Sequence, residues 1–292
     1  MKLIADEFHL QVNGLSYAAQ RWRHVLPGDA ESELRPVLCL HGWLDNSESF
    51  ARLAPLMVGC EVVAIDMAGH GETSHRAAHA RYDIYDDLED INDIADALGW
   101  QQFSLLGHSR GAGIALLYTT VMPERISSLV LLDGIAPPPG QQRNFVEQLR
   151  AHILERRTLR YKTGRPYASI ERALEKRLQM TALSADEARD MVARDLIKND
   201  EGYAWRHDWR LHGASAVRLK PEQVADLLDT LAKPALLLVA NHGMVQKHGL
   251  PAQVSEHPQI TLRRHDGRHH FHLQREHVPG LAALINAWFA EH

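Results

Sequence analysis

A serine stands between two glycines where an apolar segment gives way to a helical pattern. In Gly107-His108-Ser109-Arg110-Gly111, the apolar run FSLL precedes the first glycine and the small residues of AGIA follow the second. A G-x-S-x-G sequence between a strand and a helix predicts a sharp turn that exposes the serine hydroxyl. That hydroxyl becomes a nucleophile only if a neighbouring base takes its proton.

Candidate bases gather near the end of the chain. His265, His269, His270 and His272 lie in or directly after QITLRRHDG, the last apolar strand pattern. We expect the base to come from this cluster, and the residues alone leave open which histidine it is. A zinc site in HHFH is the competing interpretation, which we set aside because the segment lacks a companion carboxylate at helical spacing.

A serine nucleophile also requires donors that stabilise the oxyanion formed on the substrate. The segment HGW follows the apolar run PVLCL, and a loop N–H at this place can act together with the N–H directly after the nucleophile. We therefore predict an oxyanion hole formed by an N–H of this loop and the N–H of Arg110.

Short strands alternating with helices must position these groups. The apolar runs PVLCL, VVAI, FSLL, LVLL and ALLLV show no polar alternation and are separated by helical patterns. This pattern predicts an α/β fold whose mostly parallel sheet is covered by helices on both faces. Asn13-Gly14 predicts a hairpin before the sheet. A helix is predicted over residues 82–98, and its acidic side is interpreted as a solvated surface.

One long segment interrupts the alternation. Prolines 137–139 predict a rigid exit from the sheet, and a helical pattern follows. We predict a core made of residues 1–136 and 221–292, with a helical cap at 137–220. The first half of the cap is rich in arginine and lysine, including Arg143, which indicates a solvated surface or, alternatively, attraction of anionic substrates.

A substrate pocket is expected beneath the cap. Trp205 and Trp209 follow Tyr203 at intervals of two and four residues, so they can either line a pocket or pack within the cap. His108 lies beside the serine. We assign Trp205, Trp209 and His108 to the predicted pocket.

Four motifs together resemble the α/β-hydrolase superfamily. HGWLDN, DMAGHGET, GHSRGA and GRHHFH occur in this order, and the resemblance covers nearly the whole chain. It implies a serine hydrolase with Ser109 as nucleophile and His269 as general base, with His270 as the alternative and His272 as a structural neighbour. It also implies oxyanion donors at the N–H groups of Trp43 and Arg110. LLLVANHG, WRHDWRL and HHFHL further resemble a serine-hydrolase-like branch.

The acid of the triad departs from the usual pattern of this family. Most relatives carry it after the penultimate strand, at the position that matches Gly243, and no carboxylate lies between Lys233 and Gly249. The family's second solution places the acid after the strand that follows the nucleophile helix, which here is Asp133. We therefore predict Asp133. The alternatives are Asp66 at the end of VVAID, and Asp266, which is expected to point elsewhere.

A serine at this turn favours acyl transfer over dehalogenation or epoxide opening, which use an aspartate nucleophile in this family. We predict hydrolysis of a small or medium acyl ester, with thioester and carbon–carbon bond cleavage as alternatives on the same triad. A non-catalytic binding protein is the alternative of another class, supported by the empty position at Gly243. No cofactor or metal is expected.

Composition limits the partners. The chain has 292 residues, 45% of them hydrophobic, a net charge of −5 and two cysteines. No basic excess indicates nucleic acid, no apolar run is long enough to span a membrane, and no secretory signal is apparent. We expect a cytoplasmic protein with a small-molecule substrate, and the sequence carries no signal for an oligomeric state.

Overall fold

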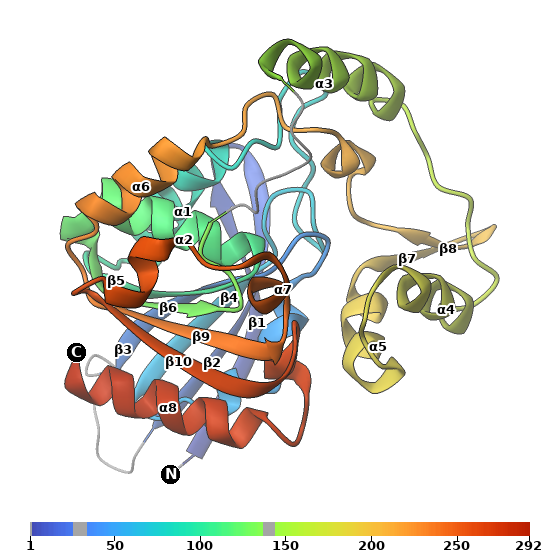
Figure 1. The fold of residues 1–292 in the computed structure, drawn as a ribbon. Helices are drawn as coiled ribbons and strands as arrows, with labels where there is room; N and C mark the ends of the chain where they lie inside the picture. Colours follow the sequence, from blue (N-terminus) through green and yellow to red (C-terminus); the bar gives the residue numbers. More distant parts are fainter. Residues whose placement is uncertain (1, 26–33, 137–143) are drawn as a thin grey trace.

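The computed structural model describes residues 2–25, 34–136 and 144–292 (Figure 1). Its centre is an eight-stranded sheet in the order β1-β2-β4-β3-β5-β6-β9-β10. The six strands from β4 to β10 along this order are parallel, whereas β1 and β2 are antiparallel to their neighbours. The strands are β1 (Lys2–Val12), β2 (Leu15–Val25), β3 (Arg35–Leu40), β4 (Cys60–Ile65), β5 (Phe103–His108), β6 (Ile126–Leu132), β9 (Ala235–His242) and β10 (Ile260–Arg268).

Helices cover both faces of this sheet (Figure 1). One apolar core lies between the sheet and α1, α2 and α6, and a second lies between the opposite face and α8. Every residue of β5 is buried, which explains why the central strands read as unbroken apolar runs. The α/β fold predicted from the sequence is confirmed. The helices are α1 (Asp86–Ala97), α2 (Arg110–Val121), α6 (Pro221–Thr230), α7 (Met244–His248) and α8 (Val278–Glu291).

The predicted hairpin joins β1 to β2. Asn13 and Gly14 occupy its turn with φ angles of 50° and 74°, which is the left-handed backbone that this pair of residues adopts readily. β2 then pairs with β4, so the hairpin extends one edge of the parallel sheet.

The acidic side of α1 is not wholly solvated, contrary to the prediction. Asp87 and Asp90 are buried, and they pair with Arg110 and Arg76 respectively. Both aspartates lie on the buried side of the helix together with Ile91 and Ile94, because arginines pack against them there, and helical spacing carries no information about those arginines. The pair with Asp87 directs the Arg110 side chain away from the serine beside it.

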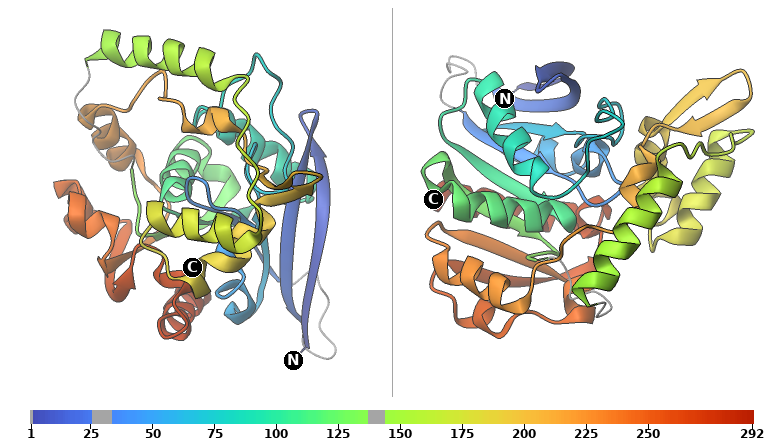
Figure 2. Two further views of the ribbon diagram at one scale, coloured as in Figure 1. Left: turned by 90° about the vertical axis from the view of Figure 1, so that its right-hand side faces the viewer. Right: turned by 90° about the horizontal axis from the view of Figure 1, so that it is seen from above.

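Residues 144–220, which the sequence analysis assigns to the insertion, lie largely beyond one end of the sheet, with α3 apart from α4 and α5 (Figure 2). The insertion has a small apolar core of its own. Beside its helices it contains a two-stranded antiparallel hairpin, which the sequence analysis did not predict because each strand has only four residues and only Leu196 among them is buried. Prolines 137–139 and Arg143 lie outside the described residues. The elements are α3 (Phe145–Leu159), α4 (Ile170–Met180), α5 (Ala185–Arg194), β7 (Leu196–Asn199) and β8 (Gly202–Trp205).

None of the helices in the described part of the chain has the length and apolar character needed to cross a membrane.

Candidate active site

Ser109 occupies a strained turn between β5 and α2. Its φ and ψ angles are 52° and −113°, a conformation that costs about 1–3 kcal/mol for a residue with a side chain. Its N–H donates to the Leu132 carbonyl at 3.0 Å. Gly111 permits the close approach of α2 to β3, because a Cβ there would lie 2.1 Å from the Leu40 carbonyl oxygen. These contacts hold the serine at the carboxyl edge of the sheet.

Three strand ends bring a hydrogen-bonded chain together at this edge. His269 Nε2 lies 2.9 Å from Ser109 Oγ, and His269 Nδ1 lies 2.6 Å from Asp133 Oδ2. Ser109 follows β5, Asp133 follows β6 and His269 follows β10. The carboxylate is fully buried, whereas the imidazole is 20% exposed. The geometry is that of a nucleophile, a base and an orienting acid.

Backbone donors fix the carboxylate of Asp133. Its Oδ1 accepts a hydrogen bond from the Ala240 N–H at 3.2 Å, and its Oδ2 accepts one from the Met244 N–H at 2.7 Å. The backbone of Asp133 has a φ of 42°, which turns the side chain from the end of β6 toward β9. These contacts hold the carboxylate against His269.

Gly243 leaves the space that this carboxylate occupies. A Cβ built on Gly243 would lie 2.2 Å from Asp133 Oδ2 and 2.4 Å from Asp133 Oδ1. A side chain at 243 and the observed position of Asp133 therefore exclude each other. The position that is an acid in most of the family is empty here because another carboxylate fills the same volume.

The other two aspartates considered for this role have different partners. Asp66 accepts hydrogen bonds from the N–H groups of Ser47 and Glu72 and forms an ion pair with Arg194 of the insertion. Asp266 Oδ1 accepts from the Asn241 side chain at 2.6 Å. Asp66 thus braces loops next to the site, and Asp266 points to the surface.

The remaining histidines of the late cluster face away from Ser109. His270 Nε2 lies 3.1 Å from Asp45 Oδ2, and His272 Nε2 lies 2.8 Å from Ser49 Oγ. Burial lowers the pKa of His272 well below its usual range, so this ring is neutral. His265 Nδ1 contacts the Asp266 carbonyl. Of the four candidates, His269 is the one that reaches the serine.

The two predicted oxyanion donors flank Ser109 in the same cavity. Arg110 is the first residue of α2, so its N–H has no acceptor within the helix and lies at the positive end of the helix dipole. The indole of Trp43 donates to the Leu211 carbonyl at 3.0 Å, which ties this loop to the insertion. Both backbone N–H groups remain available for a substrate oxygen.

A cavity of about 880 Å³ contains Ser109 and is walled by both the core and the insertion. The predicted pocket residues His108, Trp205 and Trp209 are not among those that line it. This prediction therefore requires correction. Trp205 packs inside the insertion, where its indole donates to the Tyr167 hydroxyl, and Trp209 stacks on His212.

His108 misses the cavity because successive side chains of a strand point to opposite faces. It is the last residue of β5, its ring is fully buried, and its Nε2 lies 3.0 Å from the His269 carbonyl oxygen. Its neighbours are Asp45 and His270.

The sequence analysis missed a histidine that does line the cavity. His212 lies over Trp43, and its Nε2 is 3.3 Å from Nε2 of His207, whose Nδ1 contacts the buried Asp195 at 2.5 Å. Burial and the nearby His207 lower the pKa of His212 to about 4, so the ring presented to the cavity is neutral. The sequence contains one signal for this residue, the WRHDWRL segment that ends directly before His212.

Known proteins share this architecture. A family model described as alpha/beta hydrolase fold matches residues 35–276. A serine hydrolase-like protein of Danio rerio is 28% identical over 288 residues, covering 94% of this chain and 85% of the relative. One from Dictyostelium discoideum is 28% identical over 280 residues, covering 89% of this chain and 75% of the relative.

A solved structure also matches along its full length. The crystal structure of a hypothetical protein from Pseudomonas aeruginosa superimposes with a TM-score of 0.88 at 34% identity, covering 97% of this chain and 99% of the other. The thioesterase domain from the curacin biosynthetic pathway has a TM-score of 0.78 at 23% identity, covering 97% and 99%. At 23% identity, the likeness to the thioesterase domain shows a shared fold alone.

The exclusion between positions 133 and 243 predicts a non-additive effect on stability. Gly243→Ala should lower the free energy of unfolding by about 1–3 kcal/mol, because the added methyl group overlaps the Asp133 carboxylate. In an Asp133→Gly background the same substitution should cost much less, since the obstructing carboxylate is gone. Urea unfolding of the four proteins measures the difference. An equal cost of Gly243→Ala in both backgrounds would contradict the assignment.

Proposed function

The chain belongs to the α/β-hydrolase family, in its serine-hydrolase-like branch, and we propose that it hydrolyses small or medium acyl esters through an acyl-enzyme at Ser109. The observation that carries this proposal is the continuous hydrogen-bonded chain from Ser109 through His269 to Asp133. Each link is within the distance at which a proton can be transferred or a ring held in one orientation.

Acylation begins as Ser109 Oγ bonds to the ester carbonyl carbon and its proton passes to His269 Nε2. The imidazolium that forms is stabilised by the Asp133 carboxylate at Nδ1, while the carbonyl oxygen becomes an oxyanion. The N–H groups of Trp43 and Arg110 are the donors assigned to that oxyanion. Collapse of the tetrahedral intermediate breaks the bond to the leaving alcohol, which takes the proton from His269.

Water then releases the acyl group by the same steps. His269 accepts a proton from the water as its oxygen bonds to the acyl carbon, and the second tetrahedral intermediate expels Ser109 Oγ. His269 returns the proton to the serine, so the free acid leaves and the starting state is restored. The insertion acts in this proposal as the cap that walls the cavity.

The size and lining of the cavity support an acyl group of small or medium length. Its volume of about 880 Å³ lies within the range of about 300–1,000 Å³ that is typical of small-molecule sites. Apolar side chains from α2, the strand edge and the insertion form much of its wall, among them Ile114, Ile135, Leu211, Val245 and Leu250.

The other interpretations lose part of their support. A non-catalytic role was suggested by the missing acid at Gly243, but the Asp133 carboxylate occupies that volume and contacts His269. Thioesters and carbon–carbon bonds would use the same triad, so a substrate panel that includes acyl-CoA thioesters and diketo acids distinguishes them from esters.

Removal of the nucleophile and the acid should have graded effects. Ser109→Ala should abolish turnover of p-nitrophenyl acyl esters, and Asp133→Asn should lower kcat on the order of 10⁴-fold because the imidazole loses its orienting carboxylate. Steady-state kinetics with p-nitrophenyl acetate and butyrate measure both. Asp66→Asn is the matched control for the acid. Undiminished hydrolysis by Ser109→Ala, or a larger loss in Asp66→Asn than in Asp133→Asn, would refute these roles.

Positive charge on the cavity wall favours substrates that carry a negative group away from the ester. Arg156 and Arg218 line the cavity, and neither forms an ion pair with a carboxylate among the described residues. Arg156 donates instead to the Ala80 carbonyl at 3.1 Å. A carboxylate or phosphate on the substrate would therefore meet cations that are not already neutralised.

Neutralising these two arginines should change selectivity more than chemistry. In Arg156→Gln and Arg218→Gln, we expect KM to rise about three- to tenfold for an acyl ester with a terminal carboxylate and to change little for a neutral ester of equal length. Arg263→Gln removes a charge from an exposed residue of β10 outside the cavity and should alter neither value. Equal KM changes for the charged and neutral esters would count against an anionic substrate.

A further inference from the structure

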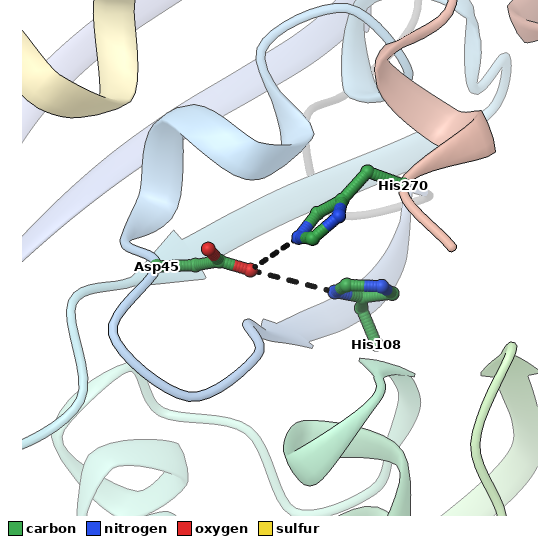
Figure 3. A group of neighbouring side chains, drawn as sticks. All are labelled: Asp45, His108 and His270. Atoms are coloured by element: carbon green, nitrogen blue, oxygen red, sulfur yellow. Dashed lines mark hydrogen bonds and ion pairs between the residues drawn. The ribbon is translucent and has the colours of Figure 1, made fainter. Parts of the chain in front are cut away.

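Behind the catalytic histidine lies a second group of polar side chains, formed by Asp45, His108 and His270 (Figure 3). Each residue offers one ligand atom, and these atoms all lie within 4.8 Å of one another. Asp45 and His108 are 3% and 0% exposed, whereas the His270 side chain is 13% exposed. The mechanism proposed above uses none of these three side chains.

Hydrogen bonding fixes the tautomer of His108. Its Nε2 faces the carbonyl oxygen of His269 at 3.0 Å, and a carbonyl only accepts, so Nε2 must carry the proton. Nδ1 is then left with a free lone pair, and this fully buried atom has no hydrogen-bond partner among the described residues.

That lone pair points at a carboxylate. Asp45 Oδ2 lies 3.6 Å from His108 Nδ1 and 3.1 Å from His270 Nε2. The Asp45 carboxylate also forms an ion pair with Arg177 at 2.7 Å. Two buried acceptors therefore face each other with no hydrogen between them, an arrangement that a cation between them would stabilise.

Glycine at position 42 keeps side-chain atoms away from Asp45 and His108. A Cβ on Gly42 would lie 2.7 Å from Asp45 Oδ2 and 3.0 Å from His108 Nδ1, so glycine keeps the space beside both atoms open. His270 is the most exposed of the three residues.

We propose that Asp45, His108 and His270 bind a divalent transition-metal ion of the Zn²⁺ class. Tetrahedral Zn²⁺ with ligands at about 2.0–2.1 Å requires ligand atoms about 3.3 Å apart. The two distances from Asp45 Oδ2 are 3.1 Å and 3.6 Å, and the two histidine nitrogens, which lie within 4.8 Å of each other, move to this spacing when the ion binds. Two imidazoles and one carboxylate are a set that Zn²⁺ takes, with a fourth position left for water.

Outer contacts orient these ligands as in known metal sites. Arg177 donates to Asp45 Oδ1 at 2.7 Å, which leaves Oδ2 for the ion. His108 donates its other ring N–H to a backbone carbonyl, a common arrangement for metal-binding histidines. The sequence analysis set aside a metal site in HHFH for want of a carboxylate, and the fold supplies one from the distant loop after β3.

Calorimetric titration of the full chain without a polyhistidine tag tests the site. Zn²⁺ should bind the wild-type protein at one ion per chain. His270→Gln and Asp45→Asn should each weaken that binding by at least about tenfold, because each removes one ligand atom. Circular dichroism checks that both variants fold, and the half-buried His270→Gln carries the test if Asp45→Asn does not.

Another histidine pair distinguishes this site from adventitious binding. The rings of His265 and His277 lie 5.4 Å apart on and after β10, so the double variant His265→Gln/His277→Gln should keep wild-type affinity. An anomalous difference peak between Asp45, His108 and His270 in a Zn²⁺-soaked crystal is the expected structural result. No binding to the wild type, wild-type affinity in His270→Gln, or a peak only at other histidines would overturn the proposal.

Discussion

The site depends on a backbone conformation that most side chains avoid. Ser109 has a φ of 52°, and Leu44 and Asp133 also have positive φ angles. Such conformations persist only where the surroundings leave no alternative. Here the rigid parallel strands β3, β5 and β6 supply the constraint, and Gly111 lets α2 approach them closely enough to maintain it. The sheet and its two apolar cores therefore hold this hydroxyl in an unfavourable backbone conformation, from which we propose that it reacts.

The proposed triad acid can be supplied from two places in this fold, after β6 at Asp133 or after β9 at position 243. Asp133 and a side chain at Gly243 would compete for the same few cubic ångströms, and the backbone N–H groups of Ala240 and Met244 already converge on that volume. The proposed base requires a carboxylate next to Nδ1 of His269. Which strand carries that carboxylate does not change the interaction. The empty position at Gly243 therefore does not by itself indicate a lost activity.

The sequence was most informative where local chemistry decides structure. Unbroken apolar runs predicted the parallel sheet, Asn13-Gly14 predicted the hairpin, and the glycines around Ser109 predicted its turn. Predictions failed where segments distant in the sequence determine a residue's environment. Asp87 is buried against Arg110, and Trp205 faces Tyr167 instead of the cavity. His212 could not be identified because its place depends on how the insertion folds over Trp43. The buried group around Asp45 likewise joins loops that are far apart in the chain.

Two polar groups adjoin the triad, one at the cavity wall around His212 and one behind His269 around Asp45. Either group can influence catalysis only if Ser109 is the nucleophile. That Ser109 is the nucleophile is the central claim. The most direct measurement is intact-protein and peptide mass spectrometry after acid quenching of the protein during turnover of p-nitrophenyl acetate. We predict one acetyl group per chain, located on the peptide that contains Ser109 and absent from Ser109→Ala. Hydrolysis without any acylated serine, or an acetyl group confined to another residue, would contradict the account.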